Sequence, residues 1–222
     1  LTLVFVLTSF ISYFTFSENI YFQFLKTTIS SIIYSANIFL WKNTNYFSES
    51  GEFNPLLHIW SLSLEEQFYF IWPIFLIILI KLTKKNFFIN FSIFFIIFTL
   101  SLLISILFKS SLLATFYLLP FRLFEFLTGS LISLFLLNFK IPNFKFKNLI
   151  PIFGLSLIIY SLLPINNYVF FPYYHSLFPC FGVSLLIMFN SKDNILNKIF
   201  SNNIFVYIGL ISYTLYLFHW PI

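Results

Sequence analysis

Long apolar stretches, separated by short polar ones, cover most of the chain. A helix rises about 1.5 Å per residue, so about 20 apolar residues cross the hydrocarbon core of a bilayer. Measured against that length, the pattern predicts seven membrane spans, near 1–16, 57–80, 87–108, 112–138, 148–163, 172–189 and 203–222. Another stretch, 28–41, is short and apolar on one side, and we expect it to lie along the membrane interface or to dip in and return. The chain is thus predicted to be an all-α, polytopic transmembrane helical bundle that forms one integral-membrane domain over 1–222.

The composition excludes an ordinary soluble domain. Of the 222 residues, 59% are hydrophobic and 9% are charged, whereas soluble domains carry about 25% charged residues. The single cysteine, Cys180, rules out an internal disulfide. Three widely separated histidines, without a cysteine cluster, argue against a metal site.

The lysines indicate which loops face the cytoplasm. Eight of them lie in the loops after Ile80, near 139–148 and around 190–202, whereas the alternate loops 41–56, 109–111 and 164–171 hold two between them. By the positive-inside rule the lysine-rich loops are cytoplasmic. The net charge of +5 therefore indicates membrane topology rather than nucleic-acid binding. This topology requires 17–56 to stay wholly outside, and it places His58 towards the outer leaflet.

The polar chemistry is concentrated in one stretch, which begins at Asn54 and reads NPLLHIWSLSLEEQFYFIWP. Pro55 suits the first turn of a helix, because its fixed φ is helical and its missing N–H would have no partner there. We therefore expect a helix from Pro55 through Trp72 and into the apolar tract that follows.

At about 100° per residue, His58, Ser61 and Glu65 share one face of that helix, which Tyr69 and Trp72 continue. Glu66 lies beside that face. An imidazole, a hydroxyl and a carboxylate together predict a site, and a carboxylate at this depth is expected to face protein or a water-filled cavity. The alternative is that these groups merely lie in the headgroup layer, where Trp and Tyr also collect. Which of the two glutamates faces the site is left open.

A second constellation surrounds Arg122, the only arginine of the chain. It lies about ten residues into its span, where an unpaired Arg costs roughly 2.5–3.5 kcal/mol. Glu125 follows at i+3, within pairing reach, and Gly129 on the same face is expected to let another backbone approach closely. Two interpretations stay open: an ion pair that locks helices together, and a planar guanidinium that holds an anionic group such as a coenzyme phosphate.

A third constellation reads SYTLYLFHWP from Ser212 to Pro221. Ser212, Tyr216 and His219 share a helical face, and a histidine inside a span is expected to face the bundle interior. Alone, His219 is equally explained as a packing or hydrogen-bonding residue.

Together the three stretches resemble acyltransferase family three, membrane enzymes that acylate cell-surface sugars. The resemblance is carried by NPLLHIWSLSLEEQFY from Asn54, RLFEF from Arg122 and SYTLYLFHWP from Ser212, whose order and spacing also fit. It implies an acyl-CoA donor, usually acetyl-CoA, on the cytoplasmic side, and no bound cofactor. It also implies a hydroxyl acceptor on lipopolysaccharide, peptidoglycan, an exopolysaccharide or a lipid-linked sugar, among the lipids of a bacterial inner membrane.

Family members carry a histidine taken to be catalytic in their first span, ten residues after an Arg or Lys. That region would precede Leu1, and both ends of the chain break off within apolar patterns. We therefore expect a fragment of a longer protein, inactive by itself.

The resemblance suggests roles for the residues singled out above. Glu65 or Glu66 would orient the missing histidine or bind the sugar, with His58 as a further catalytic candidate. Arg122 would position the donor, with Glu125 fixing its geometry. The remaining candidates for substrate binding are Trp60, Ser61, Gln67, Ser212, Tyr216 and His219.

Two other classes of protein remain as alternatives. A transporter or flippase would line a substrate path with intramembrane charges and would have paired broken helices. Four prolines could break helices in this way: Pro120, Pro164, Pro172 and Pro179. Their positions show no symmetric pairing. A non-catalytic membrane scaffold would not explain why Arg122, Glu65 and Glu66 are present.

Overall fold

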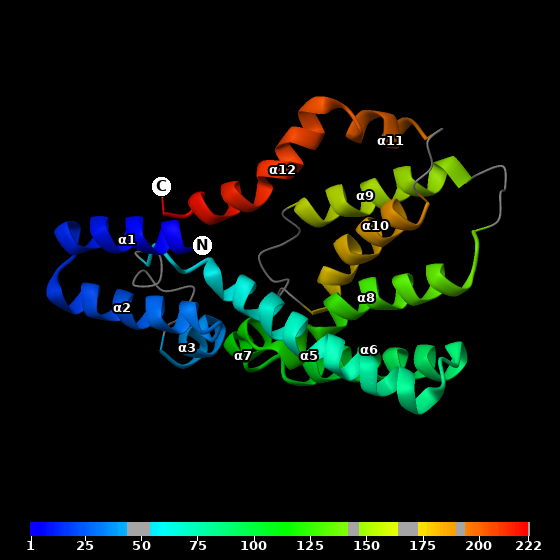
Figure 1. Ribbon diagram of the computed structural model, residues 1–222, viewed down its shortest axis with the longest axis horizontal. Helices are drawn as coiled ribbons and strands as arrows, with labels where there is room; N and C mark the ends of the chain where they lie inside the picture. The colour runs from blue at the N-terminus through cyan, green and yellow to red at the C-terminus, as the bar shows by residue number, and fades with distance from the viewer. Residues whose placement is uncertain (44–53, 142–146, 164–172, 190–193, 222) are drawn as a thin grey trace. The chain divides into compact units, whose positions relative to one another are not determined.

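The computed structural model describes residues 1–43, 54–141, 147–163, 173–189 and 194–221 (Figure 1). Helices dominate these residues and no strand occurs among them, so the predicted all-α class is confirmed. The α-helices are α1 (Thr2–Thr15), α2 (Glu18–Ile32), α3 (Ala36–Asn43), α5 (Ile59–Thr83), α6 (Phe87–Leu107), α7 (Leu112–Tyr117), α8 (Leu119–Asn138), α9 (Ile150–Leu162), α10 (Leu177–Met188), α11 (Ile195–Phe200) and α12 (Asn203–Phe218). Two short 3₁₀ turns, η1 (Lys147–Leu149) and η2 (Tyr173–Ser176), precede α9 and α10.

Three described helical stretches are long and apolar enough to cross a membrane: Ile59–Thr83, Phe87–Leu107 and Leu112–Asn138. Four shorter apolar ones cover Thr2–Thr15, Lys147–Leu162, Tyr173–Met188 and Asn203–Phe218. All seven predicted spans thus correspond to an apolar helical stretch, although only three reach spanning length. Large apolar side chains point outward from these helices, as expected of an integral membrane protein whose surface meets lipid.

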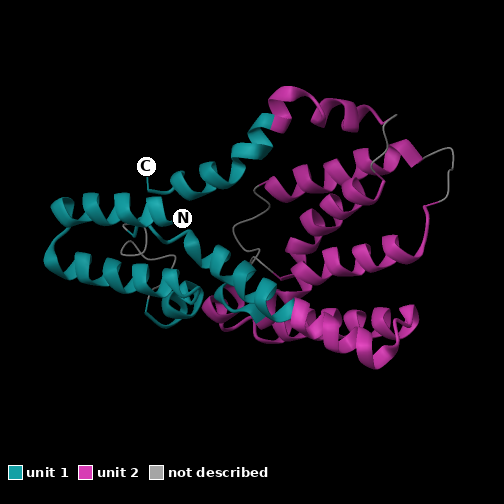
Figure 2. Cartoon of the chain, in the orientation of Figure 1, with its two compact units in different colours: residues 1–72, 117–119, 207–222 teal, residues 73–116, 120–206 magenta. Residues whose placement is uncertain are grey.

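The chain divides into two compact units (Figure 2). Unit 1 comprises 1–72, 117–119 and 207–222, and unit 2 comprises 73–116 and 120–206. The first boundary falls at Pro73, inside α5. Proline removes one backbone hydrogen bond from a helix and crowds the preceding turn, so it is a natural point of division.

Unit 1 is built on a hairpin in which α2 returns along α1. Its buried apolar cluster joins the hairpin to the start of α5 and the end of α12 through Val4, Phe5, Phe24, Leu56, Ile59, Leu62 and Leu217. Aromatic rings also pack across the turn of the hairpin, where the Tyr13 and Tyr21 centroids lie 5.7 Å apart. The segment that carries His58 is therefore anchored on the apolar face of this hairpin.

The hairpin bears on two expectations. The stretch 28–41 is divided between α2, which ends at Ile32, and α3, which begins at Ala36, after Tyr34 adopts a positive φ of 52°. Its place relative to the membrane stays a prediction. Within 17–56, α2 returns along α1, and Asn54 Nδ2 donates to Thr27 Oγ1 at 3.0 Å, in the second half of α2. Since α1 is a predicted span, the packing of α2 along it does not fit the condition that 17–56 stays wholly outside.

In unit 2 the predicted span 112–138 is divided between α7 and α8. Ser101 of α6 supports the start of α8: its hydroxyl donates to the Pro120 carbonyl at 2.7 Å and accepts from the Phe124 N–H at 3.1 Å. A buried side chain is thus inserted beside the backbone bonds of the first turn of α8, which is one recognised cause of irregular helix geometry. This turn carries Arg122.

The closest helix crossing in unit 2 lies between α9 and α10. A Cβ atom added to Gly154 would lie 2.7 Å from the Gly182 carbonyl oxygen, and one added to Gly182 would lie 2.6 Å from the Gly154 carbonyl oxygen. Only glycine fits both positions. The expectation of a close approach at Gly129 is wrong, because a Cβ atom there would meet open space.

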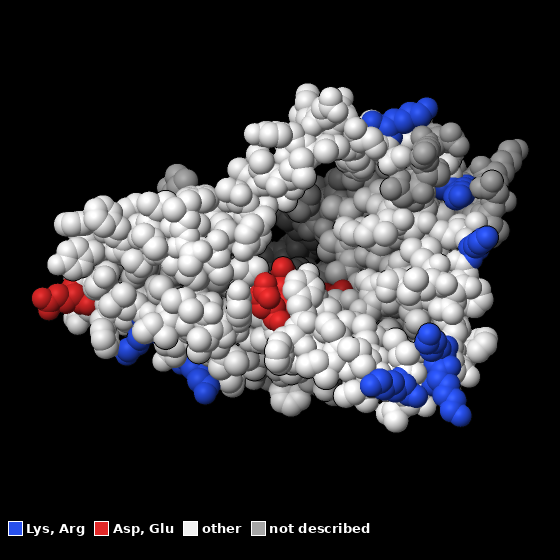
Figure 3. All heavy atoms as spheres, viewed as in Figure 1, with Lys and Arg blue, Asp and Glu red and all other residues white. Residues whose placement is uncertain are grey.

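The basic side chains of unit 2 agree with one part of the predicted topology, the shared side of the lysine-rich loops. Those at the end of α5, after α8, before α9 and within α11 gather at one end of this unit (Figure 3). They are Lys81, Lys84, Lys85, Lys140, Lys147 and Lys198. Lys145, Lys192 and the loop 164–171 lie outside the described residues. The shared end agrees with the prediction, and the side of the membrane that it faces stays a prediction.

Candidate functional site

The segment before α5 forms turns where the sequence predicted the first turns of a helix. Asn54 Oδ1 accepts from the Leu56 N–H at 3.0 Å, and the Asn54 carbonyl accepts from the Leu57 N–H at 3.0 Å. Asn side chains stabilise such turns by bonding to the backbone two residues on. The helix therefore begins at Ile59 rather than at Pro55, and His58 lies just before it.

A cavity of about 230 Å³ opens beside this segment within unit 1. It brings together the first and third constellations of the sequence, and its lining residues are Leu57, His58, Trp60, Ser61, Tyr216, His219 and Trp220. Trp220 Nε1 donates to the Asn54 carbonyl at 2.9 Å, which fixes the end of the chain against the turn. We call this space the His58 cavity.

Hydrogen bonds order one wall of the His58 cavity. Tyr216 Oη donates to the His58 carbonyl at 2.5 Å and is also hydrogen-bonded to Ser61 Oγ. A phenol has a single proton, so while Tyr216 donates to the His58 carbonyl, Ser61 donates to Tyr216; Ser61 Oγ also lies 3.4 Å from the His58 carbonyl, to which it can donate instead. His219 Nδ1 lies 2.5 Å from the Tyr216 carbonyl oxygen. A donating Nδ1–H leaves Nε2 of His219 as a lone-pair acceptor.

The His58 imidazole is the unusual group of this cavity. The residue is 7% exposed, and neither ring nitrogen makes a hydrogen bond to a described residue. The Leu217 backbone comes near the ring, but outside ordinary hydrogen-bond geometry. The ring centroid lies 5.2 Å from that of His219 and 5.4 Å from that of Tyr216. A buried polar group without a partner costs about 1–3 kcal/mol, so this ring is available to a ligand or to water.

The glutamates of α5 do not line the cavity. Glu65 and Glu66 are half-buried, and both lie close enough to Tyr213 of α12 to act on it electrostatically. Neither makes an ion pair with a described residue. Ser61 and Glu65 keep the i, i+4 spacing of one face within α5, whereas His58 lies in the turn before the helix; of the three, His58 and Ser61 line the cavity.

Three other candidates have clear positions in unit 1. Trp60 is buried, lies edge-on to Tyr117 at 5.4 Å and lines the His58 cavity. Gln67 Nε2 donates to the Tyr34 carbonyl and to Asn37 Oδ1, each at 2.8 Å, so it ties the start of α3 to α5. Ser212 is exposed and donates to the Gly209 carbonyl at 2.8 Å. The structure therefore does not bring Ser212 or Gln67 to the cavity.

The Arg122 cluster lies in unit 2 and consists of Arg122, Glu125, Phe116, Thr128 and Cys180. Arg122 Nη2 and Nε lie 2.9 and 3.1 Å from the same oxygen, Glu125 Oε2, and the two side chains are 13% and 15% exposed. The predicted pair is therefore confirmed. The guanidinium carbon lies 5.9 Å from the Phe116 ring centroid, in reach of a cation–π interaction.

The far oxygen of the carboxylate, Glu125 Oε1, is buried and makes no hydrogen bond to a described residue. Thr128 Oγ1 donates to the Glu125 carbonyl at 2.6 Å. The Cys180 thiol of α10 interacts with Thr128 and with both charges of the pair. Sequence reasoning missed Cys180, because a lone cysteine in an apolar segment carries no spacing signal.

No three His, Cys, Asp or Glu side chains of the described ranges gather in a way that would hold a metal ion. His58 and His219 come together only as a pair, with ring centroids 5.2 Å apart. Leu57 and Trp220 belong to the motifs of the first and third constellations, but only the fold shows that they line the cavity.

Known proteins are similar to this chain over most of its length. A family model described as "Acyltransferase domain" matches residues 1–222. An uncharacterized protein of Haemophilus influenzae is 34% identical over 201 residues, which cover 86% of this chain and 82% of that protein. No solved structure matches.

Two relatives have informative names. Peptidoglycan O-acetyltransferase OatA of Listeria monocytogenes is 28% identical over 219 residues, 87% of this chain and 33% of OatA. The putative peptidoglycan O-acetyltransferase YrhL of Bacillus subtilis is 42% identical over 59 residues, 26% of this chain and 9% of YrhL. The chain thus corresponds to about a third of the length of OatA.

Proposed function

The chain belongs to the acyltransferase domain family, and from that premise we propose that it moves an acyl group, usually acetyl, from acyl-CoA to a hydroxyl of a cell-envelope glycan. The names of OatA and YrhL support peptidoglycan as the acceptor. The complete protein would act at the bacterial inner membrane, where a cytoplasmic donor and an exported acceptor are both within reach of a helical bundle.

The observation that carries the site is the buried His58 imidazole, whose two nitrogens have no hydrogen-bond partner among the described residues. Acyl transfer needs a base that removes the proton of the acceptor hydroxyl while its oxygen attacks the thioester carbonyl. The tetrahedral oxyanion then collapses, the C–S bond breaks, and the CoA thiolate takes up the proton. We assign the proton-accepting role within this chain to His58.

The rest of the cavity suits a sugar hydroxyl. Its volume of about 230 Å³ is below the range of roughly 300–1,000 Å³ for sites that enclose a drug-sized ligand. It therefore fits one small group, such as a sugar ring, and not a whole acyl-CoA. Trp60 and Trp220 offer apolar faces, and His219 Nε2 offers an acceptor for a second hydroxyl. Tyr216 and Ser61 hold the His58 backbone in place.

The other charged residues receive supporting roles. One of Glu65 and Glu66 would bind further hydroxyls of the acceptor or orient another catalytic group, since both carboxylates lack an ion-pair partner among the described residues. Arg122 would position the anionic donor. Its guanidinium is already fixed by Glu125 and Phe116, so little side-chain entropy is lost on binding.

The test is His58→Gln in the complete protein, expressed in a bacterium without its own glycan acetylation. Ester-linked acetate released from the purified envelope glycan measures activity, and the amount of protein in the membrane measures folding. General bases contribute about 10²–10⁴-fold, so we expect acetylation to fall by at least that lower factor. His175→Gln in η2 is the matched control, because it makes the same chemical change in unit 2. Normal acetylation by His58→Gln would refute the assignment.

A further inference from the structure

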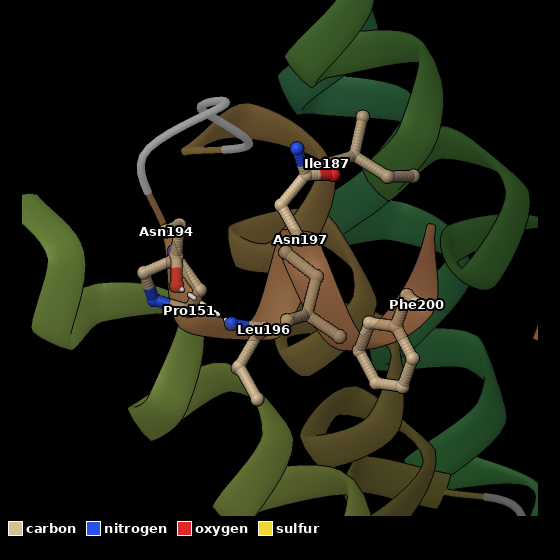
Figure 4. A pocket seen from close by; sticks show the side chains of 7 residues that line it. Pro151, Ile187, Asn194, Leu196, Asn197 and Phe200 are labelled. Carbon is tan, nitrogen blue, oxygen red and sulfur yellow. Dashed lines mark hydrogen bonds between the residues drawn. The ribbon is translucent and has the colours of Figure 1, made fainter. Parts of the chain in front are cut away.

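Two pockets, one in each unit, differ in the side chains that can bind a metal ion. The pocket beside α11 in unit 2, of about 190 Å³, is lined by apolar groups and two asparagine amides, without an imidazole, thiol or carboxylate (Figure 4). The His58 cavity in unit 1 contains two imidazoles, those of His58 and His219. These histidines lie far apart in the sequence, and the fold brings their rings to one cavity. Imidazole is the commonest metal ligand in proteins.

Each imidazole of the His58 cavity can present a nitrogen lone pair to a metal ion. His219 Nδ1 donates to the Tyr216 carbonyl at 2.5 Å, so its Nε2 carries a lone pair. Histidines that bind metal ions commonly hold their other ring N–H against a backbone carbonyl in this way. His58 is 7% exposed, and neither of its ring nitrogens makes a hydrogen bond to a described residue. Because a buried polar group without a partner is costly, the His58 ring points to a ligand.

The separation of the two rings matches that of two histidines on one tetrahedral ion. A ligating nitrogen lies about 2.0–2.1 Å from zinc, and the ring centroid lies about 1.1 Å beyond that nitrogen, in line with the bond. At the tetrahedral angle, two such rings have centroids roughly 5 Å apart. The His58 and His219 centroids are 5.2 Å apart, with the ring planes at 75°. The backbone therefore already holds the rings at the spacing that a shared ion requires.

The rest of the coordination shell would consist of small oxygen ligands. The cavity volume of about 230 Å³ accommodates several waters, since each occupies about 30 Å³ in the liquid. The Ser61 hydroxyl belongs to the same wall. None of the residues that line the cavity is Lys or Arg, so no fixed cation in its lining repels a metal ion. Imidazole ligands suit zinc, copper or nickel, whereas calcium and magnesium prefer oxygen ligands.

We propose that His58 and His219 jointly bind a zinc ion, and that the bound ion blocks the His58 cavity. The blocking role rests on the proposed function. An ion on His58 takes the lone pair that would accept the proton of the acceptor hydroxyl, and it fills the space that the acceptor would enter. Zinc is thus a reversible inhibitor that competes with the acceptor, and not a cofactor of the reaction.

The first test measures zinc binding to the complete protein in detergent by equilibrium dialysis, with the metal quantified by mass spectrometry. His58→Gln and His219→Gln should each weaken binding at this site about tenfold or more, because even the outer partners of metal ligands contribute about 10–100-fold to affinity. His175→Gln in η2 of unit 2 is the matched control and should change the affinity less than about twofold. Zinc sites elsewhere in the complete protein are common to all four proteins and cancel in the comparison. Thermal unfolding without zinc checks that each variant is folded. Wild-type zinc binding by either His58→Gln or His219→Gln would overturn the shared site.

The second test measures whether the ion blocks the cavity. Zinc should inhibit acetyl transfer by the wild-type protein, and the remaining activity of His219→Gln should need about tenfold more zinc for half inhibition. Soluble fragments of the acceptor glycan at saturation should weaken zinc binding about tenfold. Zinc binding through both histidines with undiminished acetylation would overturn the blocking role. Acetylation by His58→Gln in the presence of a metal chelator tests the proposed function without zinc, so the two proposals can fail separately.

Discussion

The His58 cavity in unit 1 and the Arg122 cluster in unit 2 place polar groups among apolar helices in opposite ways. Arg122 has its counter-charge one helical turn away, at 2.9 Å, and a ring beneath its guanidinium. His58 is more deeply buried, yet neither of its ring nitrogens has a hydrogen-bond partner among the described residues. Arg122 has its partners within the described residues, and His58 has no hydrogen-bond partner among them.

This difference predicts that the ion pair of the Arg122 cluster contributes mainly to stability and that His58 contributes mainly to activity. Removing one member of a buried ion pair strands the other charge and destabilises a protein by about 3–5 kcal/mol. Replacing a buried group that has no partner removes little stabilisation and relieves a desolvation cost. The Arg122 cluster should therefore be sensitive in folding, and the His58 cavity should be sensitive in activity.

Glu125→Ala is expected to have the largest effect on stability. It leaves the Arg122 guanidinium without its carboxylate, so the free energy of unfolding should fall by about 3–5 kcal/mol. Thermal unfolding of the detergent-solubilised complete protein measures the change. His58→Gln, measured beside it, should shift stability by less than about 1 kcal/mol. Equal losses in the two variants would contradict the distinction between the two regions.

Arg122→Lys probes whether the cluster also handles substrate. Lysine keeps the charge and a partner for Glu125 but loses the planar fork, so protein levels should stay near normal. If the guanidinium positions the donor, acetyl transfer should fall about tenfold or more, with the loss expressed in the KM for acetyl-CoA. Wild-type turnover by this variant would leave the pair with a structural role only.

Glu65→Gln and Glu66→Gln, made separately, test whether one of these two carboxylates takes part in acyl transfer. Adjacent residues point about 100° apart on a helix, so only one carboxylate can face the acceptor. One variant should lose most glycan acetylation and the other should lose little, while both remain in the membrane. Normal acetylation by both would assign this part of the motif to folding.

The features that depend on long hydrophobic patterns or on local helical spacing could be predicted from the sequence. All seven apolar stretches were located, because their hydrophobicity is a property of 15 to 25 neighbouring residues and survives local irregularities. The pairing of Arg122 with Glu125 was equally local, since i+3 spacing on a helix almost fixes the distance.

Tertiary contacts decided what the sequence could not show. A turn stabilised by Asn54 delayed the start of α5, so His58 lies before the helix that carries Ser61 and Glu65. The glycines that permit close packing are Gly154 and Gly182, and nothing in the spacing distinguishes them from Gly129. The His58 cavity joins residues 155 and more positions apart; the expectation that His219 reaches the cavity of His58 is confirmed, whereas Leu57 and Trp220 were not assigned to it from the sequence.

The central claim, that the His58 cavity receives the glycan acceptor, is tested most directly by ligand protection of Ser61→Cys. Ser61 lines the cavity and is part-exposed, so a thiol there should react with a small alkylating reagent in the complete protein. Ser133→Cys, exposed on α8 in unit 2, is the matched control after Cys180 is replaced by Ser. Soluble fragments of the acceptor glycan should slow alkylation at position 61 about tenfold at saturation and leave position 133 unchanged. Equal alkylation rates at position 61 with and without the glycan would contradict the claim.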